Sequence, residues 1–369
     1  MASRIKKRIA FFLPDLRIGG AEKVFVQLAN CFCENGYSVD LLLSQKVGSL
    51  FSTVSDKVDV ISFSQRERSR LLLLLISIYK LFQYVRRDRP DVVFSTITGA
   101  NLVAVVVKLL LPNQNTKFVL REASSFHNSG ALYRWLSGVL YSRSDCVIAG
   151  SKGVLDDLVQ RYKVDQKKAF LVRNPINTIG IKSLACEKTV HPWLENNAIP
   201  LIVSVGRLTP AKDLFTLVCA FGMVRRKVEA RLIVIGDGEC RSELEREVKE
   251  LGLEQDIDFL GIRENPYPYM RHADLFVLSS RWEGFPNVIL EALTLGCRIV
   301  STECHAGPKE ILTGIDGCML VPVADAEQMA ESVVVNLNGR LDLKEVESRL
   351  QMYSIQAVSK QYFDLVNGF

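Results

Sequence analysis

The chain has 369 residues, of which 48% are hydrophobic and 24% charged. Its length favours two folded domains, and its composition excludes a disordered, collagenous or coiled-coil protein. Its net charge of +5 combines +12 over residues 1–180 with −7 over residues 181–369. The nine scattered cysteines contain no C-x-x-C pair, which disfavours a disulfide scaffold or cysteine zinc site and suits a reducing cytoplasm.

The first half of the chain alternates short apolar runs with helical patterns. Its first run ends at Pro14, too early for the apolar region of a signal peptide, so we expect no export. Gly19 and Gly20 follow, before a helix predicted to begin near Ala21. Glycines there let backbone N–H groups approach an anion at the positive end of a helix, although a tight turn is the alternative. The predicted strands are Ile9–Leu13, Ser38–Leu43, Val92–Phe94, Phe118–Leu120, Cys146–Ala149 and Phe170–Val172.

A leucine-rich run, Leu71–Tyr79, stands out because basic residues flank it on both sides. It and Leu102–Leu111 are far shorter than the roughly 20 residues that cross a bilayer, so we expect no membrane span. A basic, apolar segment can bind the surface of an anionic membrane. A core helix with solvated basic ends is the alternative, and nucleic acid is disfavoured because no recognition motif is visible. The flanking basic residues are Arg66, Arg68, Arg70, Lys80, Arg86, Arg87 and Arg89.

The stretch Asn174–Ile199 has no periodicity and contains two prolines, so it predicts the linker between two doubly wound domains. The second half again has continuous apolar runs, typical of parallel strands covered on both faces. Its G-D-G at Gly236–Gly238 lacks the third glycine of a dinucleotide-binding motif, which disfavours a nicotinamide enzyme. The predicted strands are Leu201–Val205, Arg231–Ile235, Ile257–Leu260, Leu275–Leu278, Arg298–Val300 and Cys318–Val321.

Two segments of the second half carry the chemistry. Arg207 and Lys212 follow a predicted strand, at the edge where open α/β sheets bind ligands, and two cations there suit a diphosphate. Glu283 and Glu291, eight positions apart, lie on either side of a strand-to-helix turn. We expect Glu283 in the loop and Glu291 on the helix, where they can contact different parts of one elongated ligand.

Four motifs, in this order along the chain, resemble those of the family 4 retaining glycosyltransferases: G-G-A-E, G-R-L-x-x-x-K-D, G-D-G and E-G-F-P-N-V-I-L-E. The resemblance covers essentially the whole chain and is strongest over Leu201–Pro322. It implies the α/β GT-B fold, in which two Rossmann-like doubly wound domains face each other across a cleft. Residues 1–180 would form the acceptor domain and 181–351 the donor domain, with a C-terminal helix at about 352–369 packing back on the first.

The resemblance also implies roles for individual residues. Arg207 and Lys212 would hold the donor diphosphate and take part in catalysis with Glu283, which would bind the donor sugar, and Glu291 would bind the ribose. The acceptor would contact Gly19 and Glu22. No metal or other cofactor is expected, because basic side chains and helix N-termini neutralise the leaving group. The other donor contacts implied are Gly20, Gly206, Gly238, Ile262, Phe285, Pro286, Asn287 and Val288.

One departure from the family concerns its catalytic histidine. Many relatives carry it directly after the strand represented here by Phe118–Leu120, but this chain has Arg121 and Glu122 there, and His127 follows several residues later. Either His127 still reaches the donor sugar, or Arg121 and Glu122 have replaced it at the acceptor side of the site.

The resemblance implies transfer of a sugar from a nucleotide sugar, UDP-HexNAc or UDP-galactose by analogy with the family, to a lipid-diphosphate-linked saccharide in assembly of a surface polysaccharide such as lipopolysaccharide. The basic first half suggests contact with an anionic membrane. We therefore expect a cytoplasmic protein that binds peripherally to the inner face of the plasma membrane. A UDP-sugar epimerase of the same fold and a non-catalytic nucleotide-binding scaffold are the alternatives.

Overall fold

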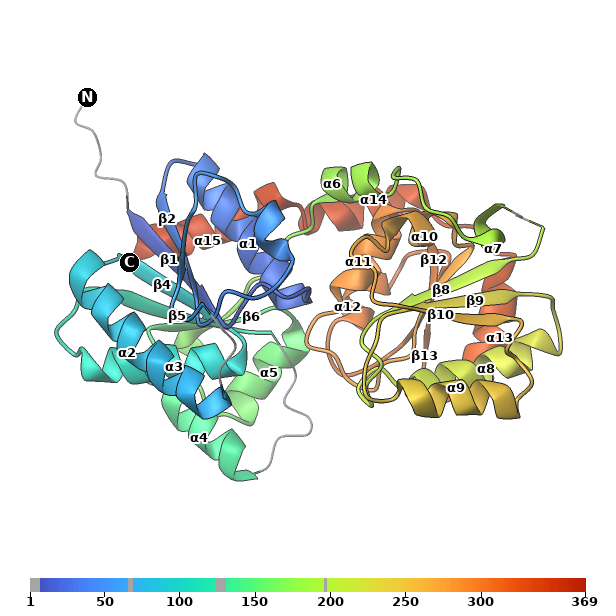
Figure 1. Ribbon diagram of the computed structural model, residues 1–369, viewed down its shortest axis with the longest axis horizontal. Coiled ribbons are helices and arrows are strands. Elements are labelled where there is room, and N and C mark those ends of the chain that lie inside the picture. The colour runs from blue at the N-terminus through green and yellow to red at the C-terminus, as the bar shows by residue number, and fades with distance from the viewer. Residues whose placement is uncertain (1–6, 66–68, 124–130, 196–197) are drawn as a thin grey trace. The chain divides into compact units, whose positions relative to one another are not determined.

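The computed structural model describes residues 7–65, 69–123, 131–195 and 198–369 (Figure 1). The chain forms two compact units: the first combines Met1–Pro175 with Ile355–Phe369, and the second is Ile176–Ser354. Each unit contains a parallel sheet with helices on both faces, which confirms the predicted α/β class. Among the described residues, no helix has both the length and the apolar character needed to cross a bilayer.

The sheet of the first unit has, in the described residues, seven strands in the order β3-β2-β1-β4-β5-β6-β7. The order reverses between β1 and β4, which pair in parallel with Ile9 opposite Val92. Loops leaving the carboxyl ends of two strands at such a reversal run to opposite faces, and the crevice between them is where open α/β sheets bind ligands. The strands are β1 Arg8–Leu13, β2 Ser38–Leu43, β3 Asp59–Ser62, β4 Val92–Thr96, β5 Lys117–Glu122, β6 Cys146–Ala149 and β7 Ala169–Leu171.

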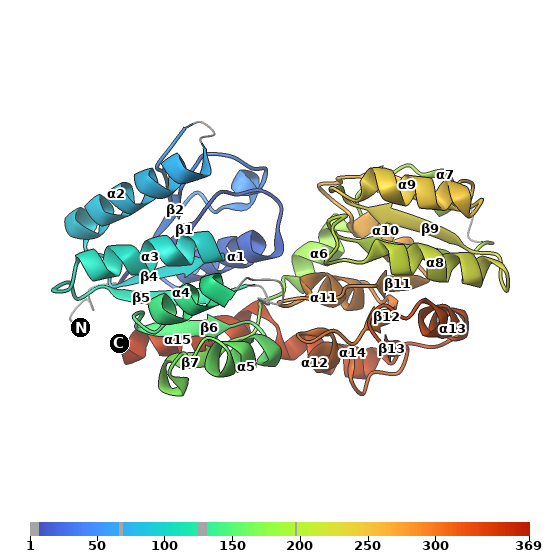
Figure 2. The same ribbon diagram turned by 90° about the horizontal axis from the view of Figure 1, so that it is seen from below.

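Helices cover both faces of this sheet. Helices α2, α3 and α4 lie side by side on one face, and α1 and the C-terminal α15 pack on the other (Figures 1 and 2). Phe363 of α15 makes an edge-to-face contact with Phe32 of α1 at 4.7 Å, so the last helix is part of this core. The helices are α1 Gly20–Glu34, α2 Arg70–Asp88, α3 Thr98–Leu110, α4 Ala131–Tyr141, α5 Lys152–Gln160 and α15 Ile355–Gly368, with 3₁₀ turns at Leu50–Thr53 and Gln166–Lys168.

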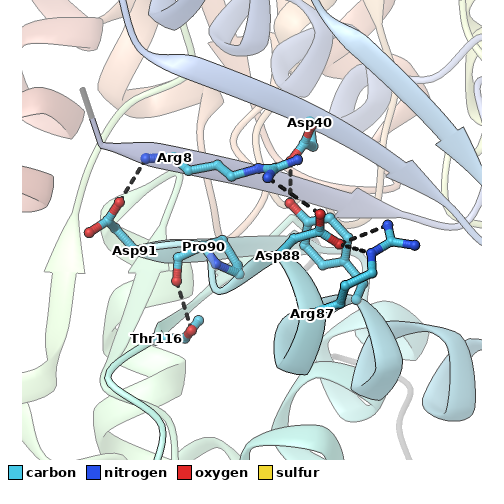
Figure 3. Close-up of polar contacts among 8 residues, drawn as sticks. Arg8, Asp40, Arg87, Asp88, Pro90, Asp91 and Thr116 are labelled. Atoms are coloured by element: carbon cyan, nitrogen blue, oxygen red, sulfur yellow. Dashed lines mark hydrogen bonds and ion pairs between the residues drawn. The ribbon is translucent and has the colours of Figure 1, made fainter. Parts of the chain in front are cut away.

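A polar cluster holds the amino-terminal edge of this sheet to α2 (Figure 3). The Nε of Arg8 donates to Asp40 Oδ2 at 2.7 Å, and its backbone N–H donates to Asp91 Oδ2 at 2.7 Å. The hydroxyl of Tyr84 also donates to Asp40, which is fully buried. Burial and this hydrogen bond raise the pKa of Tyr84 above its ordinary value, so the hydroxyl stays protonated and remains a donor.

Replacing Asp40 by Ala is therefore expected to destabilise the first unit by about 2–3 kcal/mol, because the Arg8 charge and the buried Tyr84 hydroxyl lose their shared acceptor. Urea unfolding measures the loss. Asp59→Ala, which removes an exposed carboxylate from β3, is the control and should change stability by less than about 0.5 kcal/mol. Equal effects of the two substitutions would show that the cluster does not stabilise the sheet.

The second unit also contains a parallel sheet. Among the described residues, this sheet has six strands in the order β10-β9-β8-β11-β12-β13. Here the order reverses between β8 and β11, where Ile202 lies opposite Leu275. The crevice at the carboxyl ends of β8 and β11 is therefore the expected ligand site of this unit. The strands are β8 Leu201–Val205, β9 Arg231–Ile235, β10 Ile257–Gly261, β11 Leu275–Leu278, β12 Arg298–Thr302 and β13 Cys318–Val321.

Two separate apolar cores flank this second sheet. Helices α8, α9 and α13 cover one face, and α6, α10, α11, α12 and α14 gather on the other (Figure 1). The helices are α6 Thr178–Leu184, α7 Pro192–Glu195, α8 Leu214–Arg225, α9 Arg241–Glu250, α10 Tyr267–His272, α11 Asn287–Thr294, α12 Pro308–Leu312, α13 Ala326–Leu337 and α14 Leu343–Met352.

The structure adds elements that the sequence did not predict. The edge strand β3 was missed because it is short and only half-buried, so its apolar run is weak. The stretch Asn174–Ile199, predicted as a linker without periodicity, contains the short helices α6 and α7, and α6 begins where the side chain of Asn177 accepts a hydrogen bond from Gly180 N at 2.9 Å.

Candidate functional site

The candidate donor site lies on the loops that follow β8 and β11. These strands are neighbours at the reversal of the sheet, so residues 206–213 and 279–286 leave the same edge side by side. Arg207 is exposed, whereas the Lys212 side chain is 21% exposed and its stem packs on Gly206, where an added Cβ would lie 3.4 Å from Lys212 Cε.

Lys212 and Glu283, both predicted from sequence, are in direct contact. Lys212 Nζ lies 2.5 Å from Glu283 Oε1, and the same oxygen accepts a hydrogen bond from Ser280 Oγ at 2.6 Å. The Glu283 side chain is only 10% exposed. The structure thus brings a cation and a carboxylate together at the carboxyl edge of the sheet, in a setting where water screens their interaction little.

A second ion pair joins the same two loops. Asp213 is buried in the left-handed conformation, with φ 45° and ψ 50°, and accepts hydrogen bonds from Arg281 Nε at 2.9 Å and Thr216 Oγ1 at 2.8 Å. Two hydrogen bonds to backbone carbonyl oxygens also join these loops. Arg281 N donates to Ala211 O at 2.8 Å, and Ser279 Oγ donates to Lys212 O at 2.8 Å.

Glu291 lies on the second turn of α11, as predicted, and is 7% exposed. Its Oε1 accepts a hydrogen bond at 3.2 Å from the hydroxyl of Tyr267, the first residue of α10. A buried carboxylate that is fixed by a tyrosine is a suitable acceptor for a pair of ligand hydroxyls. Tyr267 was not predicted, because its contact with Glu291 depends on how α10 packs against α11.

The turn between the two glutamates is packed tightly. Phe285 is buried against Tyr353, with ring centroids 5.6 Å apart, and Pro286 is the N-cap of α11 rather than its first helical residue. Gly307, at φ 97°, lies so close to Pro286 that an added Cβ would be 2.2 Å from its Cδ. This packing fixes the start of α11, at Asn287 and Val288, where a helix favours an anion.

The two glycines of G-D-G have a packing role in the structure. An added Cβ on Gly236 would lie 1.9 Å from Gly206 O, and one on Gly238 would lie 2.3 Å from Leu208 O. Both glycines therefore allow the loops after β8 and β9 to pack backbone to backbone. Ile262 is 67% exposed beside β10, and its role and that of Gly238 as donor contacts stay predictions.

In the first unit, the predicted acceptor residues Gly19 and Glu22 lie together at the start of α1, after β1. An added Cβ on Gly19 would lie 2.2 Å from Glu22 Oε2, so glycine is needed for this carboxylate to fold back over the helix N-terminus. Gly20, the predicted donor contact, is the first helical residue. This cluster follows β1, one of the two strands at the reversal of the sheet.

Arg121 and Glu122 end β5 with side chains that are 1% exposed. Arg121 donates to Asn174 and to Thr96, and Glu122 Oε2 accepts a hydrogen bond from the hydroxyl of Tyr141 at 2.6 Å. These contacts give both side chains structural partners inside the unit, and their role in binding the acceptor stays a prediction. The predicted catalytic His127 lies outside the described residues.

The leucine-rich run of the first unit is the surface helix α2. Its exposed apolar side chains follow one another at helical spacing: Leu71, Leu75 and Tyr79 are 68%, 57% and 59% exposed. Arg86 continues this row, and its guanidinium lies over the Phe82 ring at 5.6 Å. Exposure of these side chains contradicts the alternative of a core helix. Leu75, Ile78, Tyr79, Phe82 and Leu110 of α3 line a shallow apolar hollow.

Comparison with known proteins supports what the motifs predicted. Residues 18–179 match the family described as "Glycosyltransferase Family 4", and residues 199–338 match "Glycosyl transferases group 1". Together the two matches span most of the chain and correspond to its first and second units.

Two curated relatives align with this chain over most of their length. The chain is 27% identical to an N-acetylgalactosamine-N,N'-diacetylbacillosaminyl-diphospho-undecaprenol 4-alpha-N-acetylgalactosaminyltransferase of Campylobacter jejuni, over 89% of each chain. It is 26% identical to the lipopolysaccharide core biosynthesis glycosyltransferase LpsE of Rhizobium meliloti, over 94% of this chain and 96% of that one.

Solved structures of glycosyltransferases have the same fold. The crystal structure of HepE from Anabaena, in complex with UDP and glucose, superposes with a TM-score of 0.80 and 17% identity over 98% of this chain and 100% of that one. This likeness shows the GT-B fold. The chain belongs to the family 4, or group 1, glycosyltransferases, a family that includes enzymes of bacterial surface polysaccharide assembly.

Proposed function

We propose that this chain is a retaining glycosyltransferase that moves a sugar from a UDP-sugar to a lipid-diphosphate-linked saccharide. The observation that carries the proposal is the juxtaposition of Lys212 and Glu283 at the carboxyl edge of β8 and β11, with Glu291 buried on the helix that follows. A cation for a diphosphate and two carboxylates for hydroxyl groups are the groups that recognise the three parts of a nucleotide sugar.

In this mechanism the acceptor hydroxyl oxygen forms a bond to the anomeric carbon while the bond from that carbon to the diphosphate breaks. Negative charge develops on the departing phosphate oxygen, and Arg207 and Lys212 stabilise it. That phosphate oxygen takes the proton from the attacking hydroxyl on the same face of the sugar, so the anomeric configuration is retained and UDP leaves. Glu283 orients the sugar through its hydroxyls.

We propose that the reaction needs no metal ion, because Arg207, Lys212 and the start of α11 supply positive charge where the diphosphate binds. Transfer in the presence of EDTA tests this, and NMR of the product determines the anomeric configuration. Full activity in EDTA with an α-product from an α-donor is expected. Activity restored only by added Mg²⁺ or Mn²⁺, or an inverted product, would contradict the mechanism.

The printed names of the relatives support the substrate class. Two Campylobacter jejuni relatives are named for transfer of N-acetylgalactosamine to diphospho-undecaprenol saccharides, and a Salmonella typhimurium relative is named as a lipopolysaccharide galactosyltransferase. We therefore propose UDP-HexNAc or UDP-galactose as donor and a saccharide on a polyprenyl diphosphate as acceptor. The start of α1, with Gly19 and Glu22, is the proposed acceptor contact.

A lipid-linked acceptor implies that the enzyme works at a membrane surface. We propose that the exposed row Leu71, Leu75 and Tyr79 of α2 enters the interface, while Lys80 and Arg86 face anionic headgroups. The excess of 26 Lys and Arg over 14 Asp and Glu in residues 1–180 supports this orientation, and a peripheral location at the cytoplasmic face of the membrane is part of the proposal.

Glu291→Ala is expected to weaken UDP binding by about 1.5–3 kcal/mol, because the ribose hydroxyls lose a charged acceptor. Isothermal titration calorimetry measures the change. Glu291→Gln keeps the shape of the buried side chain and should give a smaller loss, which separates the ribose contact from a packing defect. Wild-type affinity for UDP in both variants would exclude Glu291 from the ribose site.

A further inference from the structure

The Lys212–Glu283 ion pair has a consequence for nucleotide binding. The two groups that the proposed function assigns to the diphosphate and to the sugar are each other's partners, at 2.5 Å, and their side chains are only 21% and 10% exposed. A diphosphate that binds Lys212 therefore competes with Glu283 for the same ammonium group, and weakens or replaces its contact with the carboxylate. Once it has done so, Glu283 is a second anion beside a ligand that carries several negative charges.

We propose that Glu283 competes with the nucleotide diphosphate for Lys212, and thereby makes the enzyme bind product UDP more weakly than its nucleotide-sugar donor. This inference rests on the proposed function. A nucleotide sugar brings hydroxyl groups that donate to the displaced carboxylate, so both members of the ion pair regain a partner. UDP lacks the donor sugar and its hydroxyl groups, so a nearly buried carboxylate is left facing the diphosphate, which costs binding free energy.

The surrounding contacts allow this exchange to take place without movement of the loops. The Asp213–Arg281 ion pair and the hydrogen bond from Ser279 Oγ to Lys212 O hold the two loops together independently of Glu283. Left-handed backbone is unfavourable for a residue other than glycine, and Asp213 keeps it because Arg281 and Thr216 fix its side chain. The backbone on both sides of the exchangeable pair is thus fixed.

Glu283 has further neighbours that are consistent with this role. Ser280 Oγ donates to the same oxygen that Lys212 contacts, so after exchange the carboxylate keeps one hydrogen bond and its position. Ser280 is itself held, because its carbonyl oxygen accepts a hydrogen bond from Thr302 Oγ1 at 2.6 Å. Burial raises the pKa of the neighbouring Cys304 thiol to about 12, so this group adds no charge to the site.

The test compares the affinity for UDP of the wild type, Glu283→Gln, Lys212→Ala and the double variant by titration calorimetry. Glu283→Gln removes the competing charge and keeps the shape, so it should bind UDP about three- to tenfold more tightly than the wild type. This gain should be smaller in the Lys212→Ala background, where no ion pair has to be broken and only the repulsion between Glu283 and the diphosphate is removed. Glu250→Gln, which removes an exposed carboxylate at the end of α9, is the matched charge control and should leave the affinity unchanged.

Two results would overturn the inference while leaving the proposed function in place: wild-type or weaker UDP affinity in Glu283→Gln, or an equal gain with and without Lys212. The first would mean that Glu283 does not oppose the nucleotide, and the second that it acts through another group. Failure of the wild type itself to bind UDP would overturn the proposed function, and this inference with it. Circular dichroism of each variant checks that it is folded.

Discussion

Lys212→Ala is expected to lower kcat for sugar transfer about 10²- to 10³-fold. The ammonium group stabilises negative charge that develops on the leaving diphosphate, and preorganised charge of this kind contributes on that scale. The substitution also leaves Glu283, whose side chain is 10% exposed, without the cation that partners it. Initial rates of UDP release with a lipid-linked acceptor measure the loss.

Lys227→Ala is the control, because it removes an exposed lysine just after α8, in the same unit. It should retain activity within about twofold, as substitutions at the surface generally do. Arg207→Ala should resemble Lys212→Ala, since its exposed side chain follows the same strand. Wild-type kcat in Lys212→Ala would exclude this residue from charge stabilisation and would leave Arg207 as the one remaining side chain assigned to that role.

The triple substitution Leu71→Ser, Leu75→Ser and Tyr79→Ser should reduce binding to phosphatidylglycerol vesicles about 100-fold. Each of these side chains buries apolar surface if it enters the interface, at roughly 25 cal/mol per Å², so three of them contribute about 3 kcal/mol. All three are more than half exposed, so their replacement should leave the fold intact. Sedimentation with vesicles measures the partition coefficient.

The second unit offers a matched control for this experiment. Ile179, Val335 and Leu343 are 81%, 63% and 65% exposed, and their replacement by Ser removes similar apolar surface from the second unit. This triple variant should bind vesicles like the wild type. An equal loss in both variants would show nonspecific adsorption, and no loss in either would exclude α2 as the membrane contact.

The architecture was predictable wherever a strand is buried on both faces. β8, β9 and β11 are mostly apolar and have the bounds that the sequence predicted, because a strand covered by helices on both faces is apolar at most of its positions. β3 was missed for the same physical reason: an edge strand that is half solvated need not be apolar throughout, so composition does not reveal it.

The site was predictable in its residue types but not in its contacts. The strand-turn-helix pattern placed Glu283 in a loop and Glu291 on a helix, and both placements are confirmed. The contact of Glu283 with Lys212 joins residues 71 positions apart and exists because β8 and β11 are adjacent in the sheet. Strand order is set by the packing of the whole unit, so no local sequence pattern could predict the Asp213–Arg281 ion pair.

Sugar transfer to a lipid is tested by measuring donor consumption and lipid product in one reaction. Purified protein is mixed with a panel of UDP-sugars and a membrane-lipid extract in EDTA, and UDP release and the mass of the lipid product are determined, with Lys212→Ala as control. We expect that one donor releases UDP while a lipid gains the mass of one sugar, and that Lys212→Ala slows both about 10²- to 10³-fold. Binding of UDP without transfer from any donor, as a scaffold would show, or epimerisation of a UDP-sugar with the lipid unchanged, would contradict it.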